Sequence, residues 1–131
     1  MIVEAGRDNE AAQWLKARGV SIVPPYVTLV LMDGEKIRAV ALFNNYQASN
    51  IDLSIVADGA EFQRKHVRAL FTYPFKTLKV NRISVRTSAD NIKVRKLIRR
   101  LGFEPEGKSL KFYGQSAAMN YGMLRENCKW L

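Results

Sequence analysis

The chain has 131 residues, a length that supports one domain with one hydrophobic core. Hydrophobic residues make up 47% of the chain and charged residues 25%, which is typical of a globular protein and excludes a disordered or fibrous one. No stretch reaches about 18 consecutive apolar residues, which excludes a membrane-spanning helix, and the first residues lack the layout of a signal peptide. We therefore expect one cytoplasmic domain over residues 1–131.

The chain has one cysteine, Cys128, and one histidine, His66. A single cysteine excludes an internal disulfide and any metal site built on several thiolates. A single histidine excludes the common zinc sites as well. The sequence therefore predicts no metal centre.

The charge is distributed unevenly along the chain. Lys and Arg number 21 against 12 Asp and Glu, which gives a net charge of +9. Residues 64–111 hold fourteen basic and three acidic side chains, a net charge of +11, whereas residues 1–63 are net negative at −3. This asymmetry indicates an anionic partner: nucleic acid, an acidic protein or a phosphorylated small molecule. A solvated basic face without a partner is the alternative.

The first half of the chain predicts a helix followed by three strands. Asp8 begins an apolar-periodic helix that Gly19 ends. Residues 26–32 and 37–43 are rich in β-branched and apolar side chains, and the intervening Asp33-Gly34 predicts a hairpin between them. Residues 51–56 alternate apolar and polar side chains as a third strand.

The second half alternates helices with strands. An apolar stripe from Val67 to Leu78 predicts an amphipathic helix, which Pro74 should kink or loosen. Further strands are expected at residues 82–87, 110–113 and 118–124, with a second helix from Asn91 to Gly102. We expect the strands at 51–56 and 82–87 to be adjacent and parallel. This order predicts an α/β fold, a mixed sheet with helices on both faces.

Residues 91–107 carry a specific motif. The segment resembles the pattern N-x-x-(A/S)-x-x-x-h-x-x-x-G-F-x-x-x-G of GNAT-superfamily N-acetyltransferases, with Asn91 and Gly102-Phe103 at the matching positions. Residues 69–83 and 121–131 look most like the branch that acetylates ribosomal-protein N-termini and its phage-encoded relatives. The resemblance covers roughly residues 40–131 and implies a GNAT-like fold.

The resemblance also implies acetyl-CoA as acyl donor. In those enzymes the Asn matching Asn91 contacts the pantetheine arm, and the strand near Ile55 and Val56 takes the pantetheine like an added strand. The glycine-rich phosphate loop of the family is absent from residues 59–68. Cationic side chains at a helix N-terminus can replace some of its backbone donors. The residues expected at the phosphates are Gln63, Arg64, Lys65 and Arg68, with Arg95 on the next helix.

The usual general acid of the family is missing. The family places Tyr or Ser in the second helix at the positions of Ile98 and Val94, and neither side chain here can donate a proton. Tyr121 is the substitute candidate, with a core tyrosine as the alternative. Asp52 is the candidate base for the acceptor amine, with a surface aspartate as the alternative. His66 is expected near a phosphate or facing solvent.

Three functions remain open from the sequence. The first is an acyl-CoA-dependent N-acetyltransferase that transfers an acetyl group from acetyl-CoA to an amine acceptor. The second is a GNAT-fold binding or structural protein that has lost catalysis. The third is a nucleic-acid-binding basic domain, although exposed aromatic residues do not interleave with the cations, so we expect no nucleic-acid partner. We expect no membrane partner, and Trp130 and Leu131 suggest a homodimer.

Overall fold

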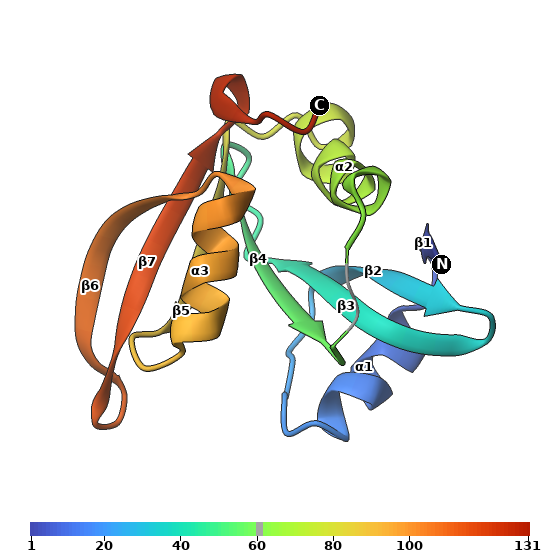
Figure 1. Cartoon of the computed structure of the whole chain (residues 1–131), viewed down its shortest axis with the longest axis horizontal. Helices are drawn as coiled ribbons and strands as arrows, with labels where there is room; N and C mark the ends of the chain where they lie inside the picture. The colour runs from blue at the N-terminus through green and yellow to red at the C-terminus, as the bar shows by residue number, and fades with distance from the viewer. Residues whose placement is uncertain (60–61) are drawn as a thin grey trace.

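Seven strands form a single sheet in the computed structural model, which describes residues 1–59 and 62–131. The strand order is β1-β2-β3-β4-β5-β7-β6 (Figure 1). Only β4 and β5 pair in parallel, and every other neighbouring pair is antiparallel. The predicted mixed sheet and its predicted parallel pair are therefore confirmed. The strands are β1 (Ile2–Glu4), β2 (Tyr26–Asp33), β3 (Lys36–Asn44), β4 (Asn50–Ala57), β5 (Arg82–Ser88), β6 (Glu104–Tyr113) and β7 (Ser116–Leu124).

The chain forms three α-helices within the described residues: α1 (Asp8–Lys16), α2 (Arg64–Thr72) and α3 (Ile92–Leu101). A π-helical turn, Tyr73–Thr77, continues α2, and a short 3₁₀ turn, Arg125–Asn127, follows β7. The predicted loosening at Pro74 thus takes the form of this π-helical turn, which the Leu78 N–H closes onto the Tyr73 carbonyl at 3.0 Å. None of the described helices is long and apolar enough to cross a membrane.

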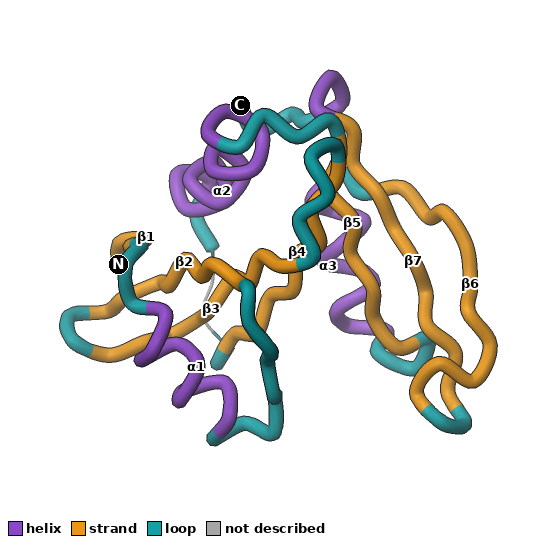
Figure 2. The backbone as a smooth tube through the Cα atoms, turned by 180° about the vertical axis from the view of Figure 1, so that it is seen from behind, coloured by secondary structure: helices purple, strands orange, loops and turns teal. Residues whose placement is uncertain are grey.

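Two hydrophobic cores lie on opposite faces of the sheet. Because side chains alternate along a strand, Val30 and Val40 meet Leu15 of α1 on one face. Phe43 and Leu53 belong to the larger core on the other face, which α2 and α3 cover. Figure 1 shows α3 in front of the sheet, and Figure 2, seen from behind, shows α1 in front. Helices therefore cover both faces, as expected.

The two edge strands differ from the sequence-based expectation. The strand expected at residues 110–113 is the end of β6, which already begins at Glu104, and β1 is not expected at all. Nearly every residue of β6 is exposed, so the strand lacks the alternation of buried and exposed side chains on which the prediction depends. The sequence pattern therefore reveals only the end of β6 and does not reveal β1.

Candidate functional site

β4 and β5 pair over three residues and then separate. The paired residues are Asn50–Asp52 on β4 and Arg82–Ser84 on β5, whereas β3 continues to pair with β4 as far as Ala57. Both views of the ribbon show β4 leaning away from β5 (Figures 1 and 2). Beyond Asp52, the backbone N–H and C=O groups of β4 that face β5 have no strand partner among the described residues. An extended ligand can pair with such groups as an added strand.

Apolar side chains border this divergence on the face covered by α2 and α3. Ile55 of β4, Val85 of β5 and Val94 of α3 are half-buried and pack against the larger core. Val56, the next residue of β4, packs instead against the core beneath α1. The side chains of Ile55 and Val56 therefore lie on opposite faces of the sheet. What the two residues have in common is backbone at the edge of β4 that faces β5.

The N-terminus of α2 presents cations to solvent. Gln63 precedes the helix, and Arg64, Lys65 and Arg68 are exposed on it, with no acidic residue in its first turn. None of the ion pairs formed between described residues involves these three cations. They and the positive end of the helix dipole favour an anion here. Residues 60 and 61 of the expected phosphate segment lie outside the described residues.

His66 is a structural residue in the first turn of α2, which corrects the alternative expectation that it faces solvent. Its side chain is buried, with 3% of its surface exposed. Its Nδ1 accepts the Gln63 N–H at 3.1 Å, so Nε2 carries the proton and donates to the Met1 carbonyl at 3.0 Å. His66 thereby links the start of α2 to the N-terminal residues of the chain.

Asn91 lies at the N-terminus of α3. Its Oδ1 accepts the Val94 N–H at 3.3 Å, so the side chain caps the helix, the role predicted from its position. Its Nδ2 has no hydrogen-bond acceptor among the described residues and its side chain is exposed, so the amide is available to a ligand. Capping and ligand contact are thus compatible at this residue.

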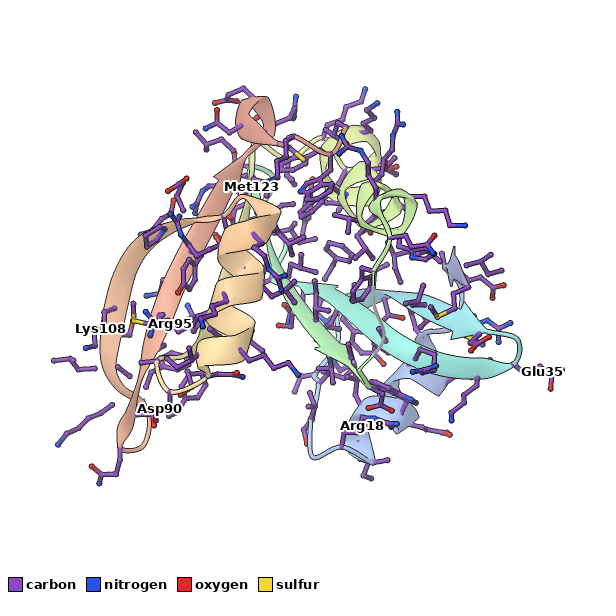
Figure 3. The ribbon with its side chains drawn as sticks, in the orientation of Figure 1. Arg18, Glu35, Asp90, Arg95, Lys108 and Met123 are labelled. Carbon is purple, nitrogen blue, oxygen red and sulfur yellow. The ribbon has the colours of Figure 1, made fainter. Side chains whose placement is uncertain are left out.

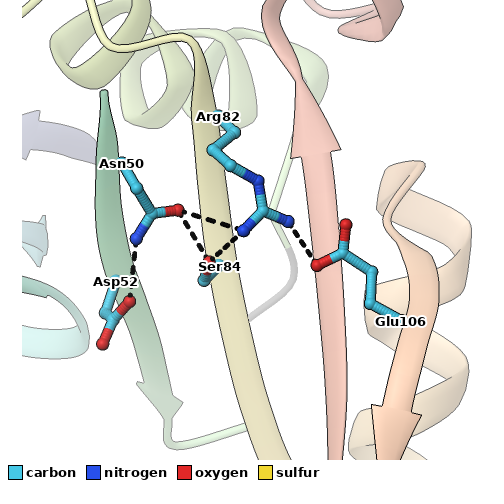
Figure 4. Close-up of polar contacts among 5 residues, drawn as sticks. All are labelled: Asn50, Asp52, Arg82, Ser84 and Glu106. Carbon is cyan, nitrogen blue, oxygen red and sulfur yellow. Dashed lines mark hydrogen bonds and ion pairs between the residues drawn. The ribbon is translucent and has the colours of Figure 1, made fainter.

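Asp52 lies where β4 and β5 begin to separate. It is opposite Ser84 in the last register position of the pair. Its Oδ1 accepts from the Asn50 Nδ2 at 3.3 Å (Figure 4), and its Oδ2 accepts from the Asn45 Nδ2 at 3.1 Å. Since Ile51 and Leu53 face the larger core, the Asp52 carboxylate lies on the opposite face of the sheet.

A polar network extends from Asp52 across four strands. Asn50 Oδ1 accepts from Ser84 Oγ at 2.7 Å and from Arg82 Nη1 at 3.4 Å, and Arg82 forms an ion pair with Glu106 of β6 (Figure 4). Sequence reasoning missed these partners of Asp52. The available signal is the polar side chain at every second residue of both strands, at Asn50 and Asp52 and at Arg82 and Ser84, which indicates one shared polar face.

Tyr121 belongs to the larger core, with 3% of its surface exposed. Its hydroxyl accepts from Arg95 Nε at 3.1 Å, and Arg95 Nη1 donates to the Ala89 carbonyl at 3.0 Å. The structure thus brings together two of the predicted site residues, Tyr121 and Arg95. It does not bring Tyr121 to Asp52, because the two side chains lie on opposite faces and β5 lies between β4 and β7.

Trp130 packs within its own chain. It contacts the larger core, its Nε1 donates to the Leu101 carbonyl at 2.7 Å, and the Arg64 guanidinium lies 5.5 Å from the centre of its ring. The residue therefore fixes the end of the chain against α3 and reaches the start of α2.

Comparison with known proteins places this geometry in a known fold. No protein-family model matches the chain, and no curated protein matches its sequence. A mutant of the spermidine N-acetyltransferase SpeG from Vibrio cholerae superposes with a TM-score of 0.80 over 100% of this chain and 98% of that one, at 15% identity. A GNAT-family acetyltransferase from Bacillus anthracis superposes with a TM-score of 0.64 over 77% of this chain and 66% of that one, at 17% identity. The chain has the GNAT fold.

The GNAT fold confirms the architecture expected from the residue 91–107 motif. A mixed sheet with helices on both faces and a parallel pair that separates are present together. At these identities the superposition concerns the fold, so the roles of individual residues depend on the geometry described above.

Proposed function

We propose that this protein is an N-acetyltransferase that transfers an acetyl group from acetyl-CoA to an amine acceptor. The observation that supports this most directly is the separation of β4 from β5 after three paired residues. Free strand backbone, a basic helix N-terminus and an available Asn91 amide suit a donor that has amide groups at one end and phosphates at the other.

Each part of the donor has a proposed partner in the chain. The backbone at Ile55 and Val56 would hydrogen bond with the amides of the pantetheine arm, since β4 lacks a β5 partner there. The Asn91 amide would contact the same arm. The exposed cations at the start of α2 would hold the pyrophosphate. The cations are Arg64, Lys65 and Arg68, and the neutral Gln63 beside them would contribute its side-chain amide.

The proposed chemistry depends mainly on positioning. The acceptor amine forms a nitrogen–carbon bond with the thioester carbonyl as the carbon–sulfur bond breaks, and unpaired β4 N–H groups would stabilise the oxyanion. Asp52 would accept the proton of the amine on the face of the sheet opposite the larger core. Water would protonate the departing thiolate more readily than Tyr121, whose hydroxyl is bonded to Arg95 on the far side of β5.

The acceptor is proposed from two sources. Residues 69–83 and 121–131 resemble the branch that acetylates ribosomal-protein N-termini and its phage-encoded relatives, which suggests a peptide α-amine in the cytoplasm. One of the similar structures is a spermidine N-acetyltransferase, which suggests a polyamine. A panel of a peptide N-terminus, spermidine and a simple amine therefore covers the acceptors that either likeness suggests.

Calorimetric titration of the donor tests the proposal. An Arg64→Ala/Lys65→Ala variant should bind CoA at least about 10-fold more weakly, because each charge-assisted contact contributes about 1.5–3 kcal/mol. Pantetheine, which lacks the pyrophosphate, should bind the variant and the parent alike. A Lys16→Ala/Lys36→Ala variant removes equal charge at exposed positions outside the site and should bind CoA normally. Equal weakening toward CoA and pantetheine would contradict the placement of the phosphates.

Turnover with the acceptor panel then separates an enzyme from a binding protein. Ile98 is buried in the core and Val94 is half-buried, so the helix that usually supplies the acid has no proton donor at these positions. We expect slow release of free thiol with at least one amine. Clear binding of acetyl-CoA without thiol release from any amine would favour the alternative, a GNAT-fold protein that has lost catalysis.

A further inference from the structure

A second basic surface lies on the far side of α3 from the β4–β5 divergence. It is a groove of about 790 Å³ between α3 and the β6–β7 hairpin. Figure 3 shows Arg95 on the side of α3 that faces β7, with Lys108 farther out on β6. None of the described residues that line the groove is acidic. Its α3 wall has Lys93, Arg95, Lys96, Arg99 and Arg100, and Pro105, Met119 and Tyr121 lie opposite.

Three of the five cations form an uncompensated row. Lys93, Lys96 and Arg100 are exposed and form no ion pair or side-chain hydrogen bond with another described residue. Their i, i+3, i+7 spacing places them along one side of α3 over about 10 Å, at 1.5 Å per residue. Arg99 differs, because it pairs with Glu104 at 2.8 Å. A row of this length suits several negative charges in sequence rather than one phosphate.

The inner end of the groove has fixed hydrogen-bond donors. Arg95 is half-buried and held by the Ala89 carbonyl and the Tyr121 hydroxyl. The Tyr121 oxygen accepts from Arg95, and its own proton has no acceptor among the described residues, although 97% of the residue surface is covered. A buried hydroxyl that lines a cationic groove with its proton free is suited to an oxyanion.

The lining favours a phosphodiester backbone over an acidic protein. Guanidinium and ammonium groups bind phosphates without reading bases, and since no exposed aromatic ring lies among the described lining residues, the affinity would come from backbone contacts without base stacking. Ile92, Pro105 and Met119 are the aliphatic side chains of the lining, and the five cations of α3 outnumber them. We propose that this groove binds the backbone of a single-stranded nucleic acid, without sequence preference and independently of acetyl-CoA. This replaces the sequence-based expectation of no nucleic-acid partner.

Fluorescence anisotropy with a labelled oligothymidylate of about 12 nucleotides tests the proposal on the full chain. With five cations engaged, raising NaCl from about 50 to about 200 mM should weaken binding about 100-fold, because each released counterion contributes a slope of about 0.7. A Lys93→Ala/Lys96→Ala/Arg100→Ala variant should bind the oligonucleotide at least about 10-fold more weakly at the lower salt. Its affinity should fall by only about 7-fold between the lower and the higher NaCl concentration, because two cations remain. A Lys16→Ala/Lys36→Ala/Lys76→Ala variant has the same net charge and should bind like the parent.

Four results would overturn the proposal. One is absence of binding at the lower salt, and another is equal weakening in both triple variants, which would indicate attraction by net charge alone. Equal affinity for polyglutamate of matched charge would indicate an acidic protein partner. Displacement of the oligonucleotide by acetyl-CoA would assign the groove to the donor. Because the readout involves no acetyl transfer, its outcome is independent of whether the chain is an enzyme. Circular dichroism of each variant verifies folding.

Discussion

At the scale of single residues, the Arg82–Glu106 ion pair passes over a glycine. Arg82 is on β5 and Glu106 on β6, with β7 between them, and the two side chains meet above Gly122. A Cβ atom at Gly122 would overlap the Arg82 guanidinium and the Glu106 carboxylate. Gly122 has ordinary strand geometry, so it is required here for the close approach of side chains rather than for its backbone freedom.

Gly122→Ala should therefore lower the free energy of unfolding by about 1 kcal/mol, since it displaces a partly exposed ion pair. In an Arg82→Ala/Glu106→Ala background the same change should instead raise it by about 0.5 kcal/mol, because alanine restricts the unfolded chain. Urea denaturation of the four proteins measures both values. A destabilisation of the same size in both backgrounds would show that the strand itself cannot accept a side chain.

The contacts of Tyr121 lead to a second prediction for a single residue. Tyr121→Phe keeps the core packing and removes a hydroxyl that is bonded to Arg95. If water protonates the thiolate, kcat for acetyl transfer should fall by less than about 10-fold, whereas loss of a general acid typically costs about 10²–10⁴-fold. The KM for acetyl-CoA serves as the control and should stay constant. A 100-fold fall in kcat would identify Tyr121 as the acid.

At the scale of elements, both ends of α3 are fixed by local chemistry. Asn91 caps the first turn, and Gly102 ends the helix in the left-handed region at a φ of 106°. The helix separates the proposed donor site from the basic groove, so its ends determine where both sets of side chains lie.

Asn91→Ala should lower the free energy of unfolding by about 1 kcal/mol, the usual value of a helix cap. Asn91→Asp keeps the acceptor oxygen and should cost less than about half as much. Thermal unfolding of the two variants makes the comparison. Equal losses would mean that the capping oxygen contributes little and that the amide nitrogen has another partner.

The end of β4 is tied to the segment after α1. Arg18, which follows α1, donates to both carboxylate oxygens of Asp58, with 3.0 Å between Nε and Oδ1. The hydrogen bonds from Arg18 lower the pKa of Asp58 below its usual value. Since β4 has no β5 partner among the described residues at this end, the ion pair adds to the pairing with β3 in holding its last residues.

Stability from the Arg18–Asp58 pair should depend on pH. Because the folded-state pKa of Asp58 is lower than the unfolded value of about 3.9, the contribution is complete above that pH and is lost as the pH falls through the folded-state pKa. Asp58→Asn should accordingly lower Tm slightly at pH 7, and the difference from the parent should shrink as the pH falls toward 2 and the parent carboxylate takes up a proton. Tm measured across this range tests it, and a constant difference would contradict the ionic origin.

At the scale of the whole molecule, one sheet separates two cores. Trp14 packs against the core beneath α1, and Trp130 packs against the core beneath α2 and α3. Each indole thus reports on one face. Because the same strands contribute side chains to both cores, neither core can unfold without exposing the other to solvent.

Unfolding should be a single transition seen equally by the two indoles. The Trp14→Phe and Trp130→Phe variants each retain one indole as the probe of unfolding. Adding Leu15→Ala to either variant should lower the urea midpoint that the remaining indole reports, by an amount equivalent to about 2–5 kcal/mol. Fluorescence in urea measures the midpoints, and circular dichroism gives the control. A shift seen by Trp14 alone would show that the two faces unfold independently.

Local features of the sequence determined much of the fold. The β-branched runs, the Asp33-Gly34 turn and the change to helical periodicity at Val67 placed five strands and three helices, because these signals depend on near neighbours. The Asn91 cap, the Gly102 stop and the parallel crossover were predictable for the same reason. The cations at the start of α2 were also visible, because a helix N-terminus is a local property.

Other features were decided only by tertiary structure. Edge strands β1 and β6 bury little on either side, so hydrophobic alternation does not mark them. Strand order and register determine on which face of the sheet the side chains of Asp52 and Tyr121 lie. They also determine where the β4–β5 pairing ends and that an ion pair passes over Gly122. The basic groove likewise requires α3 to lie beside β6 and β7. Contacts between residues distant in sequence determine all of these, and a single sequence contains no local signal for them.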